Sequence, residues 1–291
     1  MLSFGVVGTK FGSNYIRTIQ NELADIAQVT WICSKSSERY GSNTDKGRIF
    51  YTNDYKEICN NVRNIVIATP ASTHYEICKY ALEQNCNVIC EKPFTLDYVQ
   101  SLELNLIAKS KNLNLCVDHT DLWNGGYLKL KGQFNRKEIT LIEYELGDWR
   151  EQRLDVSHVF DWMPHQIAVV LDLLQKIPEI VSVEGNNDDV TVKLKAQNAA
   201  VRLRASRLMK HKMRYIDCWD EKQHWAYDDV KKNLGKNMGD DFSEESFDRK
   251  PPLTRLLEEF CAAVEAKEVR FNANLACDVV KMLEEIDKEI K

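Results

Sequence analysis

Short apolar runs alternate with amphipathic stretches through the first third of the chain. Apolar or β-branched runs of four to six residues predict strands, whereas apolar residues spaced three or four apart predict helices. The predicted strands are Ser3–Val7, Gln28–Cys33, Asn64–Ala68, Asn87–Cys90 and Leu113–Val117. The predicted helices between them are Asn14–Leu23, Asn53–Asn60, Thr73–Gln84 and Leu96–Lys111. Such alternation predicts right-handed βαβ units, and therefore a doubly wound parallel sheet with helices on both faces.

The pattern changes after about residue 120. Glu138–Glu145 predicts a strand and His158–Leu174 a helix. The short strands predicted next are Ile180–Glu184, Val190–Lys195, Ala200–Ala205, Met213–Trp219 and His224–Tyr227. Short connections between successive strands favour an antiparallel or mixed sheet. Residues 231–252 are polar and contain Gly and Pro, which predicts a loop. Two final helices are predicted over Leu253–Ala266 and Ala273–Ile290.

Composition narrows the class of protein. The 291 residues are 44% hydrophobic and 29% charged, as in ordinary globular proteins, and are enough for two domains. A net charge of −5 argues against nucleic acid as a partner. No apolar run reaches the length of a membrane span, and the N-terminus lacks the features of a secretory signal. Nine cysteines without a Cys-x-x-Cys pair predict buried free thiols in a reducing cytoplasm, and no metal site.

The first turn, Gly-Thr-Lys-Phe-Gly, follows a predicted strand and precedes a predicted helix. The Gly-x-Gly-x-x-Gly fingerprint, read from Gly8, would require glycine where Lys10 and Ser13 stand. A pyrophosphate needs backbone amides exposed at a helix N-terminus. Gly8 can supply the tight turn, Gly12 the close approach, and Lys10 a cation. On this stretch alone, a nucleotide site and an ordinary strand-to-helix turn stay equally open.

Ser34 and Lys35 directly follow the second predicted strand, with Arg39 one turn later. An acidic residue at this place would accept hydrogen bonds from the ribose 2′-hydroxyl of NAD, whereas a 2′-phosphate needs a cation. Hydroxyls and two cations therefore favour NADP over NAD, and the alternative is a solvated polar turn.

More specific signals follow two further predicted strands. One strand runs into Thr69-Pro70, with His74 in the first turn of the next helix, and the other ends in Glu91-Lys92-Pro93. Ligands of doubly wound sheets bind beyond the carboxyl ends of the strands, where both segments fall. Together they point to a cofactor site.

On the segments ATPASTH and CEKPFTL, in their order along the chain, the sequence resembles the Gfo/Idh/MocA family of NAD(P)-dependent oxidoreductases. The resemblance implies a Rossmann domain over residues 1–118, which binds the dinucleotide. It also implies an α/β domain over residues 119–291 with a mostly antiparallel open sheet, for substrate binding and assembly into a homo-oligomer (dimer or tetramer). It implies Lys92 near the nicotinamide and the reacting carbon, and Glu91 near the nicotinamide ribose. The cofactor-binding residues expected in all are Gly8, Thr9, Lys10, Phe11, Gly12, Ser34, Lys35, Thr69, Pro70, His74, Glu91 and Lys92.

The second family signature is an Asp and a His four residues apart at a helix start, matched here by Asp161 and His165. That spacing places both on one helix face. Because Pro164 fits best in a first turn, the helix is expected to begin close to Asp161. Histidine suits proton exchange with an alcohol or carbonyl. We therefore expect Lys92, His165 and Asp161 to be catalytic, the alternative being a capping Asp and a half-buried His.

Further polar and aromatic residues lie near these segments. Asp118, His119 and His158 are candidates for substrate contact, and the alternative for each is a structural role. The tryptophans that could stack on a sugar, although tryptophan is more often a core residue, are Trp123, Trp149 and Trp162.

The sequence thus predicts a cytoplasmic NAD(P)-dependent oxidoreductase, with NADP favoured and NAD possible as cofactor. It would transfer a hydride between the nicotinamide and a carbonyl or alcohol carbon of a small-molecule substrate. The resemblance favours a sugar or sugar nucleotide. Because Gly-Thr-Lys-Phe-Gly looks like the turn of thiazolinyl imine reductases, a biosynthetic imine reductase is one alternative. A non-catalytic ligand-sensing protein on the same fold is another.

Overall fold

The structure, a computed structural model, describes residues 1–35, 49–149, 151, 153–238 and 241–290. It divides into two compact units. The first joins Met1–Asp118 with Leu253–Val280, and the second joins His119–Pro252 with Lys281–Lys291. The sequence-based division also ended the first domain at residue 118, but it placed all later residues in the second. Leu253–Val280 instead packs in the first unit, where the rings of Phe4 and Phe260 lie 6.2 Å apart.

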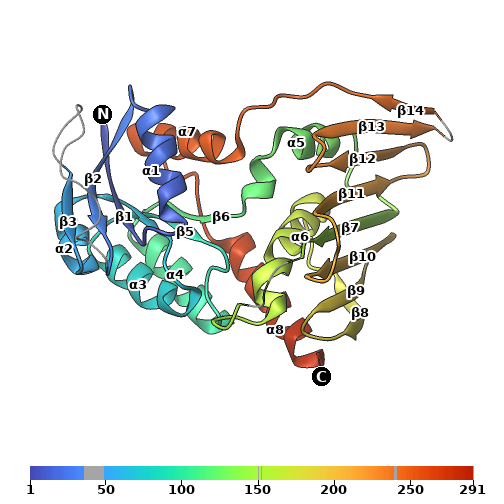
Figure 1. Cartoon of the computed structure of the whole chain (residues 1–291), viewed down its shortest axis with the longest axis horizontal. Helices are drawn as coiled ribbons and strands as arrows, with labels where there is room; N and C mark the ends of the chain where they lie inside the picture. Colours follow the sequence, from blue (N-terminus) through green and yellow to red (C-terminus); the bar gives the residue numbers. More distant parts are fainter. Residues whose placement is uncertain (36–48, 150, 152, 239–240, 291) are drawn as a thin grey trace. The chain divides into compact units, whose positions relative to one another are not determined.

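The first unit contains a six-stranded parallel sheet in the order β3-β2-β1-β4-β5-β6 (Figure 1). Its strands are β1 (Leu2–Val7), β2 (Ala27–Cys33), β3 (Phe50–Thr52), β4 (Asn64–Ile67), β5 (Asn87–Glu91) and β6 (Leu115–Asp118). The helices between them are α1 (Gly12–Asn21), α2 (Tyr55–Asn61), α3 (His74–Glu83) and α4 (Tyr98–Ser110). Every residue of β4 is buried, so both faces of the sheet are covered. The predicted doubly wound Rossmann sheet is confirmed.

The second unit contains an eight-stranded sheet in the order β14-β13-β12-β11-β7-β10-β9-β8. Its strands are β7 (Leu141–Gly147), β8 (Glu179–Gly185), β9 (Asp189–Ala196), β10 (Ala199–Ser206), β11 (Met213–Trp219), β12 (His224–Asp228), β13 (Asn233–Met238) and β14 (Asp241–Glu244). Neighbouring strands are antiparallel except β7 and β10, which are parallel. Helices α5 (Gly125–Lys131) and α6 (His158–Leu174) pack on one face of this sheet (Figure 1). The predicted mostly antiparallel sheet is confirmed.

Two terminal helices close the chain. Helix α7 is Pro252–Glu265, and α8 is Asn274–Glu289, which begins in the first unit and ends in the second. Among the described residues, no helix has both the length and the apolar character needed to cross a membrane.

Residues 231–252 are not all loop, and that prediction is wrong. Strands β13 and β14 occupy part of the segment, and β13 pairs with β12 from His224↔Asn237 to Asp228↔Asn233. The pairing uses backbone N–H and C=O groups, which every non-proline residue carries, so a polar composition does not prevent it. Short β3 and α5 were not predicted either, because each is too brief to show a period.

Helix α6 has the predicted bounds, but the expectation that it begins close to Asp161 is wrong. Its first residue is His158, and the side chain of Ser157 caps the start by accepting a hydrogen bond from the Phe160 amide. Pro164 therefore lies inside the helix. Its missing N–H leaves the Phe160 carbonyl without the usual helical donor, a local cost that the well-capped start and the buried packing of α6 offset.

Gly126 allows α5 to pack against β12. A Cβ atom added to Gly126 would lie 2.1 Å from Cε2 of Tyr227, which is too close for any side chain. We expect Gly126→Ala to lower the free energy of unfolding by about 2 kcal/mol, because the Tyr227 ring must move. Gly132→Ala at the end of the same helix is the control, since its Cβ would meet only ordinary contacts at 3.5 Å. Urea denaturation of both variants tests this, and equal midpoints would contradict it.

Candidate functional site

The turn after β1 is built around two glycines. Gly8 has φ of +92°, and a Cβ there would lie 2.5 Å from the carbonyl oxygen of Ala68. Helix α1 begins at Gly12, where a Cβ would lie 2.8 Å from Cγ1 of Val6. Its N-cap residue, Phe11, forms no capping hydrogen bond through its side chain. The turn therefore brings an uncapped helix N-terminus to the carboxyl edge of the sheet, an arrangement suited to an anionic group.

Polar side chains from the ends of β1 and β2 meet beside this turn. The hydroxyl oxygens of Thr9 and Ser34 are 3.1 Å apart. Lys10, Phe11 and Lys35 are exposed. Two hydroxyls and two solvent-facing ammonium groups are thus present on the turns where the sequence predicted them. Arg39, the other cation predicted here, lies outside the described residues.

His74 links the two signature turns. Its ring is only 1% exposed. Nδ1 lies 2.8 Å from the carbonyl oxygen of Pro93, and Nε2 lies 2.9 Å from that of Thr69. Pro70 is exposed, and Lys92 is half-buried. Because its two ring nitrogens face the carbonyl oxygens of Pro93 and Thr69, His74 connects the turns that carry Lys92 and Thr69.

Glu91 belongs to a compact acidic cluster at the same edge. It ends β5 directly opposite Asp118 at the end of β6. The buried hydroxyl of Tyr15, from α1, lies 2.5 Å from Oδ2 of Asp118 and 3.1 Å from Oε1 of Glu91. Burial, and then the negative charge of Asp118, raise the pKa of Glu91 to about 7, although Lys92 opposes the shift. Sequence analysis predicted functional roles for Glu91 and Asp118 but not for Tyr15, because an apolar-phase tyrosine on a helix is usually interpreted as a core residue.

Asp161 and His165 lie on α6, one turn apart, as predicted. Asp161 is buried, and its Oδ1 lies 3.3 Å from a guanidinium nitrogen of Arg153. The half-buried ring of His165 presents Nδ1 to Oδ2 of Asp121, 3.7 Å away. Two different carboxylates thus lie along this part of the helix, one paired with an arginine and one beside the imidazole.

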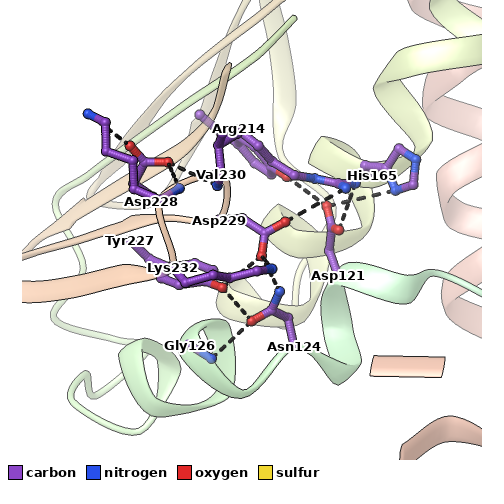
Figure 2. A network of polar contacts seen from close by, with 12 residues as sticks. Asp121, Asn124, Gly126, His165, Arg214, Tyr227, Asp228, Asp229, Val230 and Lys232 are labelled. Carbon is purple, nitrogen blue, oxygen red and sulfur yellow. Dashed lines mark hydrogen bonds and ion pairs between the residues drawn. The ribbon is translucent and has the colours of Figure 1, made fainter. Parts of the chain in front are cut away.

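Figure 2 shows the polar network to which Asp121 belongs. Its Oδ2 accepts a hydrogen bond of 2.6 Å from the hydroxyl of Tyr144 on β7. Its Oδ1 lies 2.7 Å from a guanidinium nitrogen of Arg214 on β11, and the other terminal nitrogen of Arg214 lies 3.9 Å from Asp229. Sequence reasoning missed Arg214, Tyr144 and Asp229. A signal existed, since Arg214 shares the buried face of its strand with Ile216.

The charged groups of this network stabilise one another. Burial disfavours the charged form of Arg214, but Asp121, Tyr144 and Asp229 outweigh it and raise the pKa of the guanidinium. Burial would likewise raise the pKa of Asp229, but Lys232, Tyr227 and Arg214 hold it below its usual range. Burial, and then the Asp121 carboxylate, raise the pKa of Tyr144 well above its ordinary value. These shifts favour a charged Arg214 guanidinium and a charged Asp229 carboxylate beside a neutral Tyr144 phenol.

The remaining candidates are placed as follows. His158 is buried with Nε2 3.0 Å from the carbonyl oxygen of Ala205, and burial lowers its pKa, which fits a neutral structural residue. His119 is buried at the start of a short 3-10 helix, Thr120–Trp123. Trp162 is buried 5.9 Å from the His158 ring, whereas Trp149 is exposed. No group of His, Cys, Asp or Glu suited to a metal ion occurs within the described ranges.

Comparison with known proteins finds a family match in the first domain. Residues 2–119 match the Gfo/Idh/MocA family, described as an oxidoreductase family with an NAD-binding Rossmann fold. The match covers less than half of the chain, and over these residues it confirms the resemblance recognised from the motifs. The similarity to curated relatives is partial, since the matched segment spans only 38% to 54% of the length of several of them.

Individual relatives extend the comparison. The uncharacterized oxidoreductase YhhX of Escherichia coli is 44% identical over 153 residues, which are 51% of this chain and 43% of YhhX. UDP-N-acetylglucosamine 3-dehydrogenase of Acidithiobacillus ferrooxidans is 24% identical over 72% of this chain and 70% of its own length. One structure of that enzyme covers 99% of this chain and 97% of its own, with a TM-score of 0.86 at 20% identity. Biliverdin reductase of Synechocystis, solved with biliverdin and NADP⁺, covers 99% of each chain with a TM-score of 0.80 at 15% identity. These structures share the fold.

The acidic cluster predicts an unusual pH dependence of stability. Glu91 has a folded-state pKa of about 7, above its ordinary value of 4.5, so the native state binds more protons than the unfolded state between these pH values. Its contribution therefore destabilises progressively as pH rises from about 4.5 to 7. We expect Glu91→Gln to raise the free energy of unfolding at pH 8 by about 1–3 kcal/mol, and to have little effect near pH 4.5.

Urea denaturation at the two pH values measures the effect. Glu265→Gln, at an exposed glutamate of α7, is the control and should leave the pH dependence unchanged. A stability difference between Glu91→Gln and the wild type that stays constant from pH 4.5 to pH 8 would rule out the proton-binding explanation.

Proposed function

We propose that this chain is an NAD(P)-dependent oxidoreductase that transfers a hydride between the nicotinamide and a carbonyl or alcohol carbon of a small molecule. The main support is the edge of the first unit's sheet, in a domain that matches this family. There, Gly8 and Gly12 hold open an uncapped helix N-terminus after β1, and β5, two strands away in the sheet, ends at Glu91, which Lys92 follows. A pyrophosphate needs the exposed helix N-terminus at this edge, and the resemblance to the family implies Glu91 near the nicotinamide ribose and Lys92 near the nicotinamide.

The residues of the first unit fit a bound dinucleotide. The start of α1 suits the pyrophosphate, and a side chain at Gly8 would collide with the backbone of the next turn. We propose that the Thr9 and Ser34 hydroxyls, with Lys10 and Lys35, bind the adenosine ribose and favour NADP through its 2′-phosphate. When bound, the nicotinamide supplies or accepts the hydride. NADP⁺ in the biliverdin reductase structure is consistent with this choice.

The chain's own residues would handle the proton and the developing charge. In the reducing direction, His165 donates a proton to the forming alkoxide, and Lys92 stabilises that oxygen electrostatically. Asp161, held by Arg153, binds a substrate hydroxyl. His74, which links the turns that carry Thr69 and Lys92, positions both of them.

A sugar or sugar nucleotide is the proposed substrate class. Its support is the similarity to UDP-N-acetylglucosamine 3-dehydrogenase along most of the chain. We propose a homo-oligomer, a dimer or tetramer, that works in the cytoplasm. All nine cysteines lie within the described residues, and all are buried and free, as a reducing compartment allows.

Lys92 provides the main test of the proposed reaction. We expect Lys92→Ala to reduce kcat about 100-fold or more, because a charge that stabilises the transition state is lost. Lys129→Ala, at an exposed lysine of the second unit, should keep full turnover. The assay is cofactor oxidation against a panel of keto sugars and sugar nucleotides. Full turnover by Lys92→Ala on any of them would refute the assignment.

The cofactor preference has a separate test. Titration of cofactor fluorescence should show that NADPH binds more tightly than NADH. Lys35→Ala should weaken NADPH binding about tenfold, because a charge-assisted contact to the 2′-phosphate is lost, and should leave NADH binding unchanged. Lys56→Ala, at an exposed lysine of α2, is the control. Tighter binding of NADH than NADPH by the wild type would exclude the NADP assignment.

A further inference from the structure

We infer that Asp121 is the carboxylate that positions His165, and that Arg214 fixes Asp121 and balances its charge. The inference deepens the proposed function and rests on it, because it assigns partners to the proposed proton-exchanging histidine. Asp121 and Arg214 would be positioning residues, which act on the substrate only through the imidazole.

The contacts of Asp121 define its role. Its carboxylate is about 10% exposed, and three groups that can donate hydrogen bonds surround it. Tyr144 and His165 lie at Oδ2, at 2.6 Å and 3.7 Å, and Arg214 lies at Oδ1, at 2.7 Å. The Tyr144 and Arg214 contacts hold the carboxylate in one orientation, with one oxygen facing Nδ1 of the imidazole (Figure 2). At 3.7 Å the contact is longer than a hydrogen bond, so the carboxylate acts on the imidazole through its negative charge, which favours a proton at Nδ1 and leaves Nε2 as the proton-exchanging atom.

Arg214 keeps this carboxylate from binding the imidazole proton too strongly. Asp121 and Asp229 flank the guanidinium at 2.7 Å and 3.9 Å, and Asp229 also pairs with Lys232 at 2.6 Å. The cluster without His165 therefore contains two carboxylates and two cations, and its net charge is zero. A neutral imidazole leaves that balance intact, and a proton on it adds a single charge beside a carboxylate. Such a histidine can both hold and release a proton.

The helix next to the imidazole is fixed to the sheet. Gln166 is fully buried, and its side-chain amide donates hydrogen bonds to the carbonyl oxygens of Tyr144 and Arg204, at 2.7 Å and 2.9 Å. Tyr144 thus contacts α6 through its carbonyl and Asp121 through its hydroxyl. Since Gln166 follows His165 directly, the imidazole and the carboxylate are held from the same strand, β7.

Asp161 has a different partner. One of its oxygens lies 3.3 Å from Arg153, whose guanidinium also binds Asp155 with contacts of 2.9 Å and 2.6 Å. An arginine that already binds another carboxylate compensates part of the Asp161 charge. The two acids near His165 therefore differ, and substitution of each by its amide separates their effects.

The test is an NMR titration of the six histidines in protein labelled at the imidazole Cε1, without substrate or cofactor. The signal that disappears in His165→Gln is assigned to His165. We expect Asp121→Asn to lower the titration midpoint of His165 by about one pH unit, because a negative charge beside the imidazolium is lost. Arg214→Gln should raise the midpoint, because it leaves Asp121 uncompensated. Asp161→Asn is the matched control and should shift it by less than Asp121→Asn.

Asp121→Asn and Arg214→Gln are expected to shift the titration midpoint of His165 in opposite directions. General loosening of the fold cannot explain this result, because it would shift the midpoint in the same direction in both variants. The inference is overturned if Asp161→Asn shifts His165 more than Asp121→Asn does, or if Arg214→Gln lowers the midpoint. Should Asp121→Asn fail to fold, the Arg214→Gln shift alone decides. The outcome is independent of the proposed function. Failure to turn over any keto sugar or sugar nucleotide would remove that function and leave the titration result standing.

Discussion

The pairing of β1 with β2 on one side and β4 on the other is the interaction on which the first unit's site depends. It brings the ends of three strands to one edge, so that the Gly8 turn meets Ser34 and the Ala68-Thr69 backbone. At that spacing no side chain fits at Gly8. The same constraint that closes the sheet therefore also leaves an uncapped helix start facing the ligand edge.

Sequence periodicity predicted the parallel sheet and the edge residues well, because each rests on local signals. Glu91-Lys92 and Thr69-Pro70 each lie at or just after the end of a predicted strand, and this position places them at the carboxyl edge of a doubly wound sheet. The Asp121–Arg214 network was missed, because its members come from a 3-10 helix, β7, β11 and the turn after β12, and no local pattern couples them. The one available signal was that Arg214 lies two residues before the buried Ile216 on the same strand face, which suggests that its guanidinium has a partner inside the protein.

The wrong predictions share a physical cause. The pattern of apolar and polar side chains does not directly show which backbone groups form hydrogen bonds, either between strands or at the start of a helix. Strand β13 forms from polar residues because β12 offers it a row of backbone donors and acceptors. Helix α6 begins before Asp161 because the Ser157 cap determines the start more strongly than Pro164 does. Likewise, Asp161 and His165 have the expected spacing, yet spacing alone could not reveal that Asp161 pairs with Arg153 and that Asp121 approaches the imidazole.

The buried charges also weigh against a non-catalytic ligand sensor on this fold. Removing Asp121, Asp229 and Arg214 from water costs several kcal/mol for each ion, and well-packed apolar side chains of similar volume would avoid that cost. A sensor needs shape and a few hydrogen bonds, which neutral groups provide. A reaction that adds and removes a proton needs a group whose charge changes, held in a cluster that stays balanced in both states. In the proposed reaction, His165 beside Asp121 would be that group, and the Arg214–Asp229–Lys232 chain would supply the balance.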